Sequence, residues 1–348
     1  MKISLNKISK QDTLFLKGIA IAGMLMWHIF YCPNPEGITY SPIIQYIGTI
    51  GDVCVSIFLF ISGYGLTLGY KKVGETNPIT FILNRLLKFY CNFWFVFILI
   101  VSFGTFIMHQ PILTEGSNLQ RILQLVKEFL AIRGQSSYND SWWYFSLLIS
   151  LYLIFPLLYW GTKKVPWIMI LFVIFNSSFS LHFINQDIHY YMPIFVVGIL
   201  WAMYGEKIPS ISIKKVVILL IITIIPSLAL LASIYLSIYS NSICKVGIPL
   251  YAILTIAITI LVVSLQYSTN IVKRLFCYLG TYATNIYIIH LMFSKYWFSD
   301  TFYSIKSPWL LFIALLLSSL IFSIAIEYVK TKSGYNVIFN KLITKINN

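Results

Sequence analysis

The chain contains 348 residues, of which 58% are hydrophobic and only 10% are charged, and its mean hydropathy is +0.81. Soluble globular proteins carry about 45–50% apolar and about 25% charged residues, so this composition excludes a soluble globular protein. The 25 Lys and Arg residues outnumber the 11 Asp and Glu residues, which in a soluble protein would suggest nucleic-acid binding. Here the basic residues fall between apolar runs, so membrane topology explains them better, and we expect no nucleic-acid partner.

Apolar runs long enough to cross a bilayer recur along the whole chain. We predict an all-α integral membrane protein, a bundle of about ten transmembrane helices. We expect it to form a single transmembrane domain, residues 1–348, with no appended soluble domain. The ten predicted helices are 14–31, 43–70, 86–108, 142–160, 165–183, 190–204, 215–238, 246–266, 275–296 and 308–329.

The positions of the basic residues agree with ten helices. If ten helices alternate in direction, 19 of the 25 Lys and Arg residues fall on one side of the membrane and six on the other. Cytoplasmic loops carry the excess of Lys and Arg, so both termini are predicted to be cytoplasmic. The six basic residues of the outer side are Arg121, Lys127, Arg133, Lys245, Lys295 and Lys306.

The longest outer segment, 109–141, has apolar residues at helical spacing. Leu119, Ile122, Leu123 and Val126 form a stripe that excludes Arg121. This pattern predicts an amphipathic helix on the outer membrane interface. It either covers the helix bundle or binds an anionic acceptor, and the pattern alone leaves both open.

Two residues of the first predicted helix, Lys17 and His28, are the strongest candidates for chemistry. At about 100° per residue, their spacing places both side chains on one face, roughly 16 Å apart along the axis. An ionisable group inside a span costs several kcal/mol, so its presence asks for a reason. Lys17, near the cytoplasmic end, can extend its ammonium group to the interface. His28 lies in the outer half, and a neutral histidine suits proton abstraction from a hydroxyl.

Other polar residues lie within predicted helices. His290 and Asn285 belong to a polar stretch, 280–292, that is expected to face protein or water rather than lipid. His290 is either functional or a structural histidine bonded to another helix, and the sequence favours neither. Asp52 of the second helix is a candidate partner for His28 or a lysine.

The sequence offers no pattern for a metal site. The five cysteines include no CxxC pair, and there is no HExxH, GxSxG or Walker lysine motif. We therefore expect no metal and find no support for a serine-hydrolase mechanism.

Six segments resemble, in order, those of membrane-bound acyltransferases of family 3. The first carries a basic residue, ten residues and then histidine, matched here by Lys17 and His28. The second ends in Ser-Gly-aromatic, which begins here at Ser62, and the third is a basic turn that includes Arg85 and Lys88. The six segments are 12–30, 51–66, 84–90, 142–158, 191–202 and 279–292.

This resemblance implies transfer of an acyl group, most often acetyl, from cytoplasmic acyl-CoA to a sugar hydroxyl outside. The donor substrate is then acetyl-CoA, and the acceptor is a saccharide of a surface polysaccharide, such as a capsule or cell-wall glycan, or its polyprenyl-linked precursor. The implied location is the bacterial plasma membrane. The identity of the sugar, the length of the acyl group and the oligomeric state are not specified by the sequence.

The resemblance also assigns residues to roles. His28 acts as a base or as a covalent acyl relay, and cations at the inner side bind the phosphates of the donor. The candidates are His28 and Lys17 as catalytic residues, Arg85, Lys88, Lys71 and Lys72 for donor binding, and His290, Asn285, Asp52, Ser62 and Trp143 as further site residues.

Two departures from the family pattern affect these roles. Lys17 stands where arginine is commoner, which keeps the charge but loses bidentate phosphate geometry. Leu148 stands where a glutamate is frequent, so no carboxylate can act there. The alternative function is a polytopic transporter or flippase for a lipid-linked saccharide. Transporters often contain paired repeats with interrupted helices, and no such symmetry is visible in this sequence.

Overall fold

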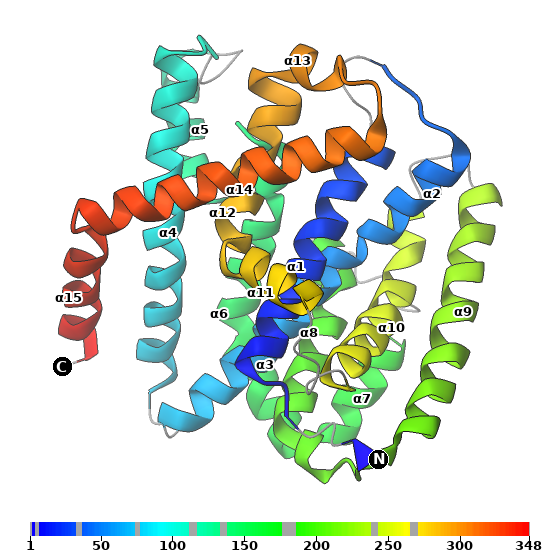
Figure 1. The fold of residues 1–348 in the computed structure, drawn as a ribbon. Coiled ribbons are helices and arrows are strands. Elements are labelled where there is room, and N and C mark those ends of the chain that lie inside the picture. Colours follow the sequence, from blue (N-terminus) through cyan, green and yellow to red (C-terminus); the bar gives the residue numbers. More distant parts are fainter. Residues whose placement is uncertain are drawn as a thin grey trace. The chain divides into compact units, whose positions relative to one another are not determined.

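Helices account for nearly all regular structure in the computed structural model (Figure 1). It describes residues 2–3, 7–32, 37–73, 77–110, 117–132, 138–175, 186–237, 243–264 and 271–347. These residues belong to two compact units whose segments alternate along the chain. Unit 1 comprises 1–32, 40–75 and 154–283, and unit 2 comprises 33–39, 76–153 and 284–348.

The all-α membrane class is confirmed. Among the described residues, seven helical segments are long and apolar enough to cross a membrane. They are Lys10–Tyr31, Pro42–Lys72, Pro78–Phe106, Asp140–Lys164, Asp187–Lys207, Ile213–Ala232 and Pro308–Lys332. Two shorter apolar helices, Pro166–Phe175 and Leu250–Ser264, correspond to further predicted spans. The number ten, the single-domain organisation and the cytoplasmic position of both termini stay predictions.

Two predicted spans differ in detail from the observed helices. The predicted helix 275–296 is divided into α11, α12 and a π-helical segment, with a break at Tyr282. The predicted helix 165–183 begins as α7, and its residues 176–183 lie outside the described part of the chain.

Unit 1 contains the N-terminal helix and most of the central helices. Its elements are β1 (Lys2–Ile3), α1 (Lys10–Met26), the π-helical η1 (Trp27–Tyr31), α2 (Pro42–Gly51), α3 (Val53–Val73), the second part of α6 (Trp143–Lys164), α7 (Pro166–Phe175), α8 (Gln186–Tyr204), η4 (Gly205–Lys207), β2 (Ile211–Ser212), α9 (Ile213–Ser237), α10 (Ile243–Ser264) and α11 (Ile271–Thr281). The two short strands pair antiparallel, with Lys2 opposite Ser212.

Unit 2 is built around the 29-residue helix α4. Its elements are α4 (Pro78–Phe106), α5 (Asn118–Phe129), η2 (Asp140–Trp142), the first part of α6, α12 (Ala283–Leu291), the π-helical η5 (Met292–Trp297), α13 (Ser299–Tyr303), α14 (Pro308–Lys332) and α15 (Tyr335–Asn347). Prolines begin α4 and α14, where the missing N–H is not needed.

Glycines allow helix backbones to approach closely in unit 1. A Cβ on Gly18 of α1 would overlap the carbonyl oxygen of Phe276 in α11, and one on Gly280 would overlap the carbonyl oxygen of Leu14. On α1, a Cβ on Gly23 would lie 3.1 Å from the carbonyl oxygen of Gly51. Small residues at such crossings permit the close packing that holds membrane helices together. Helix α1 is therefore fixed against α11 and the end of α2.

Aromatic side chains form the centre of unit 2. Phe93 of α4 contacts Trp142 and Phe145, with ring centroids 5.3 Å apart in both pairs. Phe129 of α5 stacks on Trp94 at 4.9 Å, and the Trp94 Nε1–H donates to the carbonyl oxygen of Phe129 at 2.8 Å. The helix predicted within 109–141 is thus confirmed as α5, whose apolar stripe is exposed. Its position on the outer interface stays a prediction.

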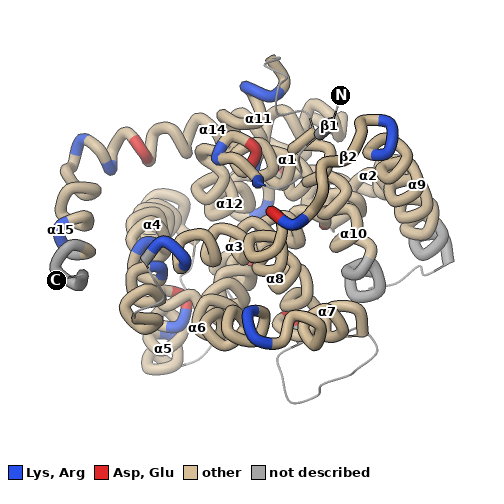
Figure 2. The backbone as a smooth tube through the Cα atoms, turned by 90° about the horizontal axis from the view of Figure 1, so that it is seen from below, with Lys and Arg blue, Asp and Glu red and all other residues tan. Residues whose placement is uncertain are grey.

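Only 10% of the residues are charged, and their positions in the fold show where charge is brought together. Figure 2 shows basic positions on α4 and α15, and acidic and basic positions of α14 toward its junction with α15. These last positions include Glu327 and Lys330, which the structure brings to α4.

Replacing Gly18 with alanine should destabilise the protein, because the added methyl group must displace the backbone of α11. We expect a loss of about 1–3 kcal/mol in the free energy of unfolding. Thermal unfolding of the purified protein in detergent measures it. Gly65→Ala is the matched control, since a Cβ on Gly65 meets no atom within 4 Å. Equal melting temperatures for Gly18→Ala and the parent would contradict the close crossing.

Candidate functional site

Helix α1 is fixed at its start by a buried carboxylate. The Ser9 hydroxyl accepts from the Asp12 N–H at 3.1 Å, and Asp12 Oδ2 accepts from the Ser9 N–H at 3.0 Å, which forms a capping box. Asp12 Oδ1 lies 3.5 Å from Lys273 Nζ of α11, and both side chains are buried. Together with Gly18 and Gly280, this ion pair sets the axial position of α1 against α11.

The structure places Lys17 and His28 on α1 and its π-helical extension. Both side chains are half-buried. Lys17 makes no hydrogen bond or ion pair with any described residue. His28 lies within η1, where the Cys32 N–H bonds back five residues to the Trp27 carbonyl at 3.1 Å. The His28 ring contacts the Trp27 ring edge to face at 4.9 Å. Single π-helical turns in α-helices are frequent at functional sites.

Asp52 lies at the junction of α2 and α3. Asp52 is 7% exposed, and its Oδ2 atom has no hydrogen-bond partner among the described residues. The Oγ of Ser56, one turn further, is likewise buried without a partner in that part of the chain. Buried polar atoms of this kind ask for an explanation, and a ligand-binding role is one. The suggested pairing of Asp52 with His28 or a lysine is not confirmed.

The remaining candidates of unit 1 lie on α3. Ser62 is half-buried beside Gly63, where α3 meets α8: a Cβ on Gly63 would overlap the carbonyl oxygen of Phe195. Lys71 and Lys72 are exposed in the last turn of α3. The Lys71 ammonium donates to the carbonyl oxygen of Ala202 at 3.0 Å, so Lys71 helps to cap the end of α8.

Unit 2 holds the other proposed donor-binding cations and Trp143. The guanidinium of Arg85 lies 5.3 Å from the centroid of the Phe81 ring, and Arg85 is half-buried. Lys88 is exposed and lies three residues further along α4, on the same face of the helix as Arg85. Trp143 begins α6 and contacts the Tyr144 ring edge to face.

His290 is fully buried on α12. Its Nδ1 lies 2.9 Å from the carbonyl oxygen of Tyr287. The Tyr287 hydroxyl donates to the carbonyl oxygen of Ser141. Two further side chains, Asn139 and Trp142, donate to the carbonyl oxygen of Ile288 at 3.0 and 3.1 Å. The helix passes into π-helical geometry at Met292. Such a junction changes which carbonyl groups are bonded within the helix, and here Asn139 and Trp142 donate to one carbonyl group beside it.

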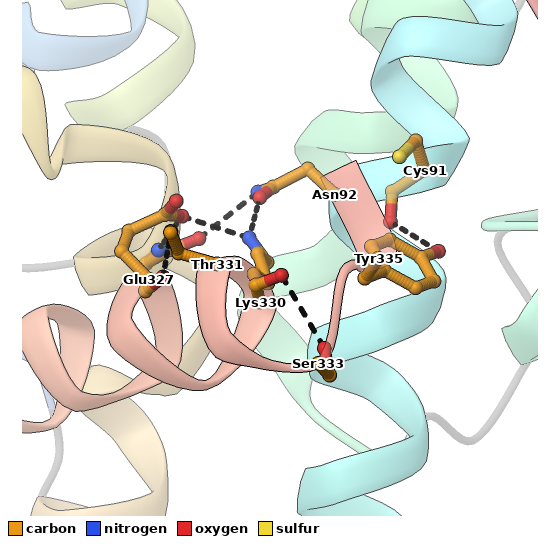
Figure 3. A network of polar contacts seen from close by, with 8 residues as sticks. Cys91, Asn92, Glu327, Lys330, Thr331, Ser333 and Tyr335 are labelled. Carbon is orange, nitrogen blue, oxygen red and sulfur yellow. Dashed lines mark hydrogen bonds and ion pairs between the residues drawn. The ribbon is translucent and has the colours of Figure 1, made fainter. Parts of the chain in front are cut away.

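Asn285 belongs to a polar cluster that the sequence analysis missed, and Figure 3 labels the other three members, Asn92, Glu327 and Lys330. Its Nδ2 donates to Glu327 Oε1 at 2.7 Å, and its Oδ1 accepts from Asn92 Nδ2 at 3.0 Å. Lys330 Nζ donates to Glu327 Oε1 at 2.8 Å and to Asn92 Oδ1. We define these four residues as the Asn–Glu–Lys cluster. It joins α4, α12 and α14.

The sequence contained a signal for this cluster. Glu327 and Lys330 are three residues apart at the end of a strongly apolar helix, so they lie on one face. The sequence analysis counted Lys330 among the cytoplasmic basic residues. In the structure, Lys330 is 2% exposed and bonded to Asn92, in the middle of α4. The reason is that Glu327 and two amides offset the cost of burying its charge.

No group of three or more His, Cys, Asp or Glu residues arranged to hold a metal ion occurs in the described part of the chain. The candidate site residues are divided between the two units. Unit 1 contains Lys17, His28, Asp52, Ser62, Lys71 and Lys72, and unit 2 contains Arg85, Lys88, Trp143, Asn285 and His290.

A comparison with protein families agrees with the resemblance found in the sequence. A family model described as an acyltransferase domain, of the acyltransferase family 3, matches residues 15–328. No curated protein and no solved structure matches the chain significantly.

Glu128 of α5 predicts a pH-dependent stability. Burial, together with the nearby Asp140 carboxylate, raises the pKa of Glu128 to about 7, although the Tyr138 N–H, which donates to Oε1 at 3.1 Å, opposes the shift. The folded protein therefore holds a proton that the unfolded chain loses near pH 4.5, so stability falls as the pH rises between about 4.5 and 7.

Glu128→Gln keeps the acceptor and removes the titration. We expect parent and variant to melt alike near pH 5 and the variant to be more stable at pH 8, by about 3 kcal/mol at most. Thermal melts across this range measure the difference. Exposed Glu206, replaced by glutamine, is the control and should leave the pH dependence unchanged. Parallel pH profiles for parent and Glu128→Gln would refute the prediction.

Proposed function

We propose that this chain, which belongs to the membrane acyltransferase family 3, transfers an acetyl group from acetyl-CoA to a sugar hydroxyl of a cell-surface polysaccharide or its polyprenyl-linked precursor. Family membership shows acyl transfer in general, because the family model covers residues 15–328. The donor, the acceptor and the roles of individual residues are the proposal. The bacterial plasma membrane is the location that it implies.

The observation that carries the proposal is the setting of His28. The residue lies in the π-helical turn that ends a helix fixed by close backbone crossings. A neutral imidazole there can take the proton of the acceptor hydroxyl. The hydroxyl oxygen then attacks the thioester carbonyl carbon, the carbon–sulfur bond breaks, and the imidazolium returns the proton to the CoA thiolate.

The alternative route passes through His28 itself. One imidazole nitrogen attacks the thioester carbonyl carbon, the carbon–sulfur bond breaks, and the CoA thiolate takes the proton of the other ring nitrogen. The acceptor hydroxyl then attacks the acyl-imidazole, the carbon–nitrogen bond breaks, and the hydroxyl proton returns to the imidazole ring. Both routes need His28, and both need cations for the phosphates of the donor. The proposal assigns this binding to Lys17, Lys71, Lys72, Arg85 and Lys88. Lys71 also caps α8, so its replacement affects packing as well.

Replacing His28 with alanine should lower the rate of acetyl transfer by about 10²–10⁴-fold, because it removes the base or the relay. The measurement is CoA release by the purified protein with its acceptor. His109→Ala is the matched control, since His109 is exposed outside the spans and should leave the rate unchanged. Full activity of a folded His28→Ala variant would exclude both routes.

The acceptor is identified in cells. NMR of the surface polysaccharide is compared between the parent strain, a deletion strain and the deletion strain complemented with His28→Ala. We expect the O-acetyl signals to disappear in the deletion strain and to stay absent with the variant. Unchanged acetylation with less polysaccharide at the surface would instead support a transporter or flippase.

Lys17 allows a test of charge against geometry. Lys17→Arg keeps the cation and should retain most activity, whereas Lys17→Met should raise the KM for acetyl-CoA about tenfold through loss of one charge-assisted contact. Steady-state kinetics separates KM from kcat. A Lys17→Met variant with the KM of the parent would remove Lys17 from donor binding.

A further inference from the structure

The Asn–Glu–Lys cluster lies beside the middle of α4 and in the last turns of α14, and both helices are long and apolar enough to cross a membrane. Asn92 is the fifteenth of the 29 residues of α4, roughly 21 Å from either end at about 1.5 Å per residue. Lys330, which donates to Asn92, is therefore beside the middle of a helix that is long and apolar enough to cross a membrane. Burying an ionisable group within a membrane span costs free energy. Such groups therefore face the protein interior or water, and they commonly mark a path for substrate.

The two charged members of the cluster differ in exposure. The Lys330 side chain is 3% exposed, whereas the Glu327 side chain is 40% exposed. Glu327 Oε1 accepts from both Lys330 and Asn285, so the exposed part of the carboxylate is available to a further donor. Hydrocarbon offers no such donor, so this position requires water or a polar ligand.

The backbone is interrupted at the same place. Helix α14 ends at Lys332, the chain turns at Gly334 with φ +70°, and α15 begins at Tyr335. The Tyr335 hydroxyl donates to the carbonyl oxygen of Cys91 on α4 at 3.0 Å, which holds this turn beside Asn92 (Figure 3). Irregular backbone at membrane depth is tolerated where it is covered by protein or lines a polar cavity.

A stripe of polar residues connects the cluster to the start of α4. Arg85, Lys88 and Asn92 are spaced by three and four residues, so they share one face of the helix. Arg85 and Asn92 are about 10 Å apart along the axis. A ligand that fits this stripe has an anionic end for the two cations and an N–H donor for Glu327 about 10 Å away.

We propose that Glu327 of the Asn–Glu–Lys cluster binds an amide N–H of the pantetheine arm of acetyl-CoA, with the phosphate groups of the same molecule on Arg85 and Lys88. This inference rests on the proposed function. The buried Lys330 is bonded to Glu327 and is a positioning residue, and Asn92 and Asn285 hold both side chains in place.

Fragments of the donor separate the two ends of the stripe. The probes are labelled CoA, displaced by pantetheine, which lacks the nucleotide, or by adenosine 3′,5′-bisphosphate, which lacks the arm. Binding to the full chain in lipid nanodiscs needs neither acceptor nor turnover. We expect Glu327→Gln to weaken CoA and pantetheine about tenfold and to leave the bisphosphate unchanged. Arg85→Gln should weaken CoA and the bisphosphate and leave pantetheine unchanged.

Folding is controlled by a second variant. Glu327→Gln alone leaves Lys330 buried without its counter-ion, so the double variant Glu327→Gln/Lys330→Met, which carries no charge there, is measured beside it. Exposed Lys332→Met on the same helix is the matched control and should bind every probe like the parent. The melting temperature of each variant identifies any that fails to fold.

The outcomes are distinct. A folded double variant that binds CoA and pantetheine like the parent overturns the inference and leaves the proposed function standing. Equal weakening of pantetheine and the bisphosphate in Glu327→Gln also overturns it, because the effect would then be structural. If the parent binds no CoA, the assignment of the donor fails, and this inference fails with it. Displacement of CoA by a polyprenyl diphosphate saccharide, but not by pantetheine, would assign the stripe to the acceptor.

Discussion

Helix α1 lies in backbone contact with its neighbours, and the candidate site of unit 1 depends on this close packing. Gly18 and Gly280 allow α1 and α11 to meet without intervening side chains, and Gly23 meets Gly51 at the end of α2. Membrane helices gain no hydrophobic free energy from packing on one another, so their association depends on van der Waals contact at small residues. These helix crossings therefore determine the positions of Lys17 and His28.

Both histidines of interest are associated with a departure from α-helical geometry. His28 lies inside η1, and His290 lies two residues before η5. A π-helical turn changes which carbonyl groups are bonded within the helix, and in a membrane each unbonded group must find another partner. At α12 the partners are Asn139 and Trp142. The segment that begins α6 therefore also determines how α12 is held.

Charged residues are few in this chain, and two buried ion pairs stand out among the described residues. Asp12 meets Lys273 in unit 1, and Glu327 meets Lys330 in unit 2. The first pair closes a helix crossing. The second has an exposed carboxylate beside an interrupted helix, which is the arrangement expected of a ligand site rather than of packing alone. This difference in exposure is why the second pair carries the inference about the donor.

The sequence by itself determined the membrane class, the helical fold and the family, because apolar length, helical spacing and ordered motifs are local properties. It also suggested Lys17 and His28 as site residues, since eleven residues along one helix predict a shared face, and their roles stay predictions. Only the tertiary structure decided that Lys330 is buried beside Asn92, because Asn92 lies on α4, 238 residues earlier in the chain, and joins Glu327 of the same helix as Lys330 in bonding the ammonium group. It also decided that 275–296 breaks at Tyr282 and becomes π-helical at Met292, where Asn139 and Trp142, from a segment far away in the chain, donate to the nearby carbonyl oxygen of Ile288.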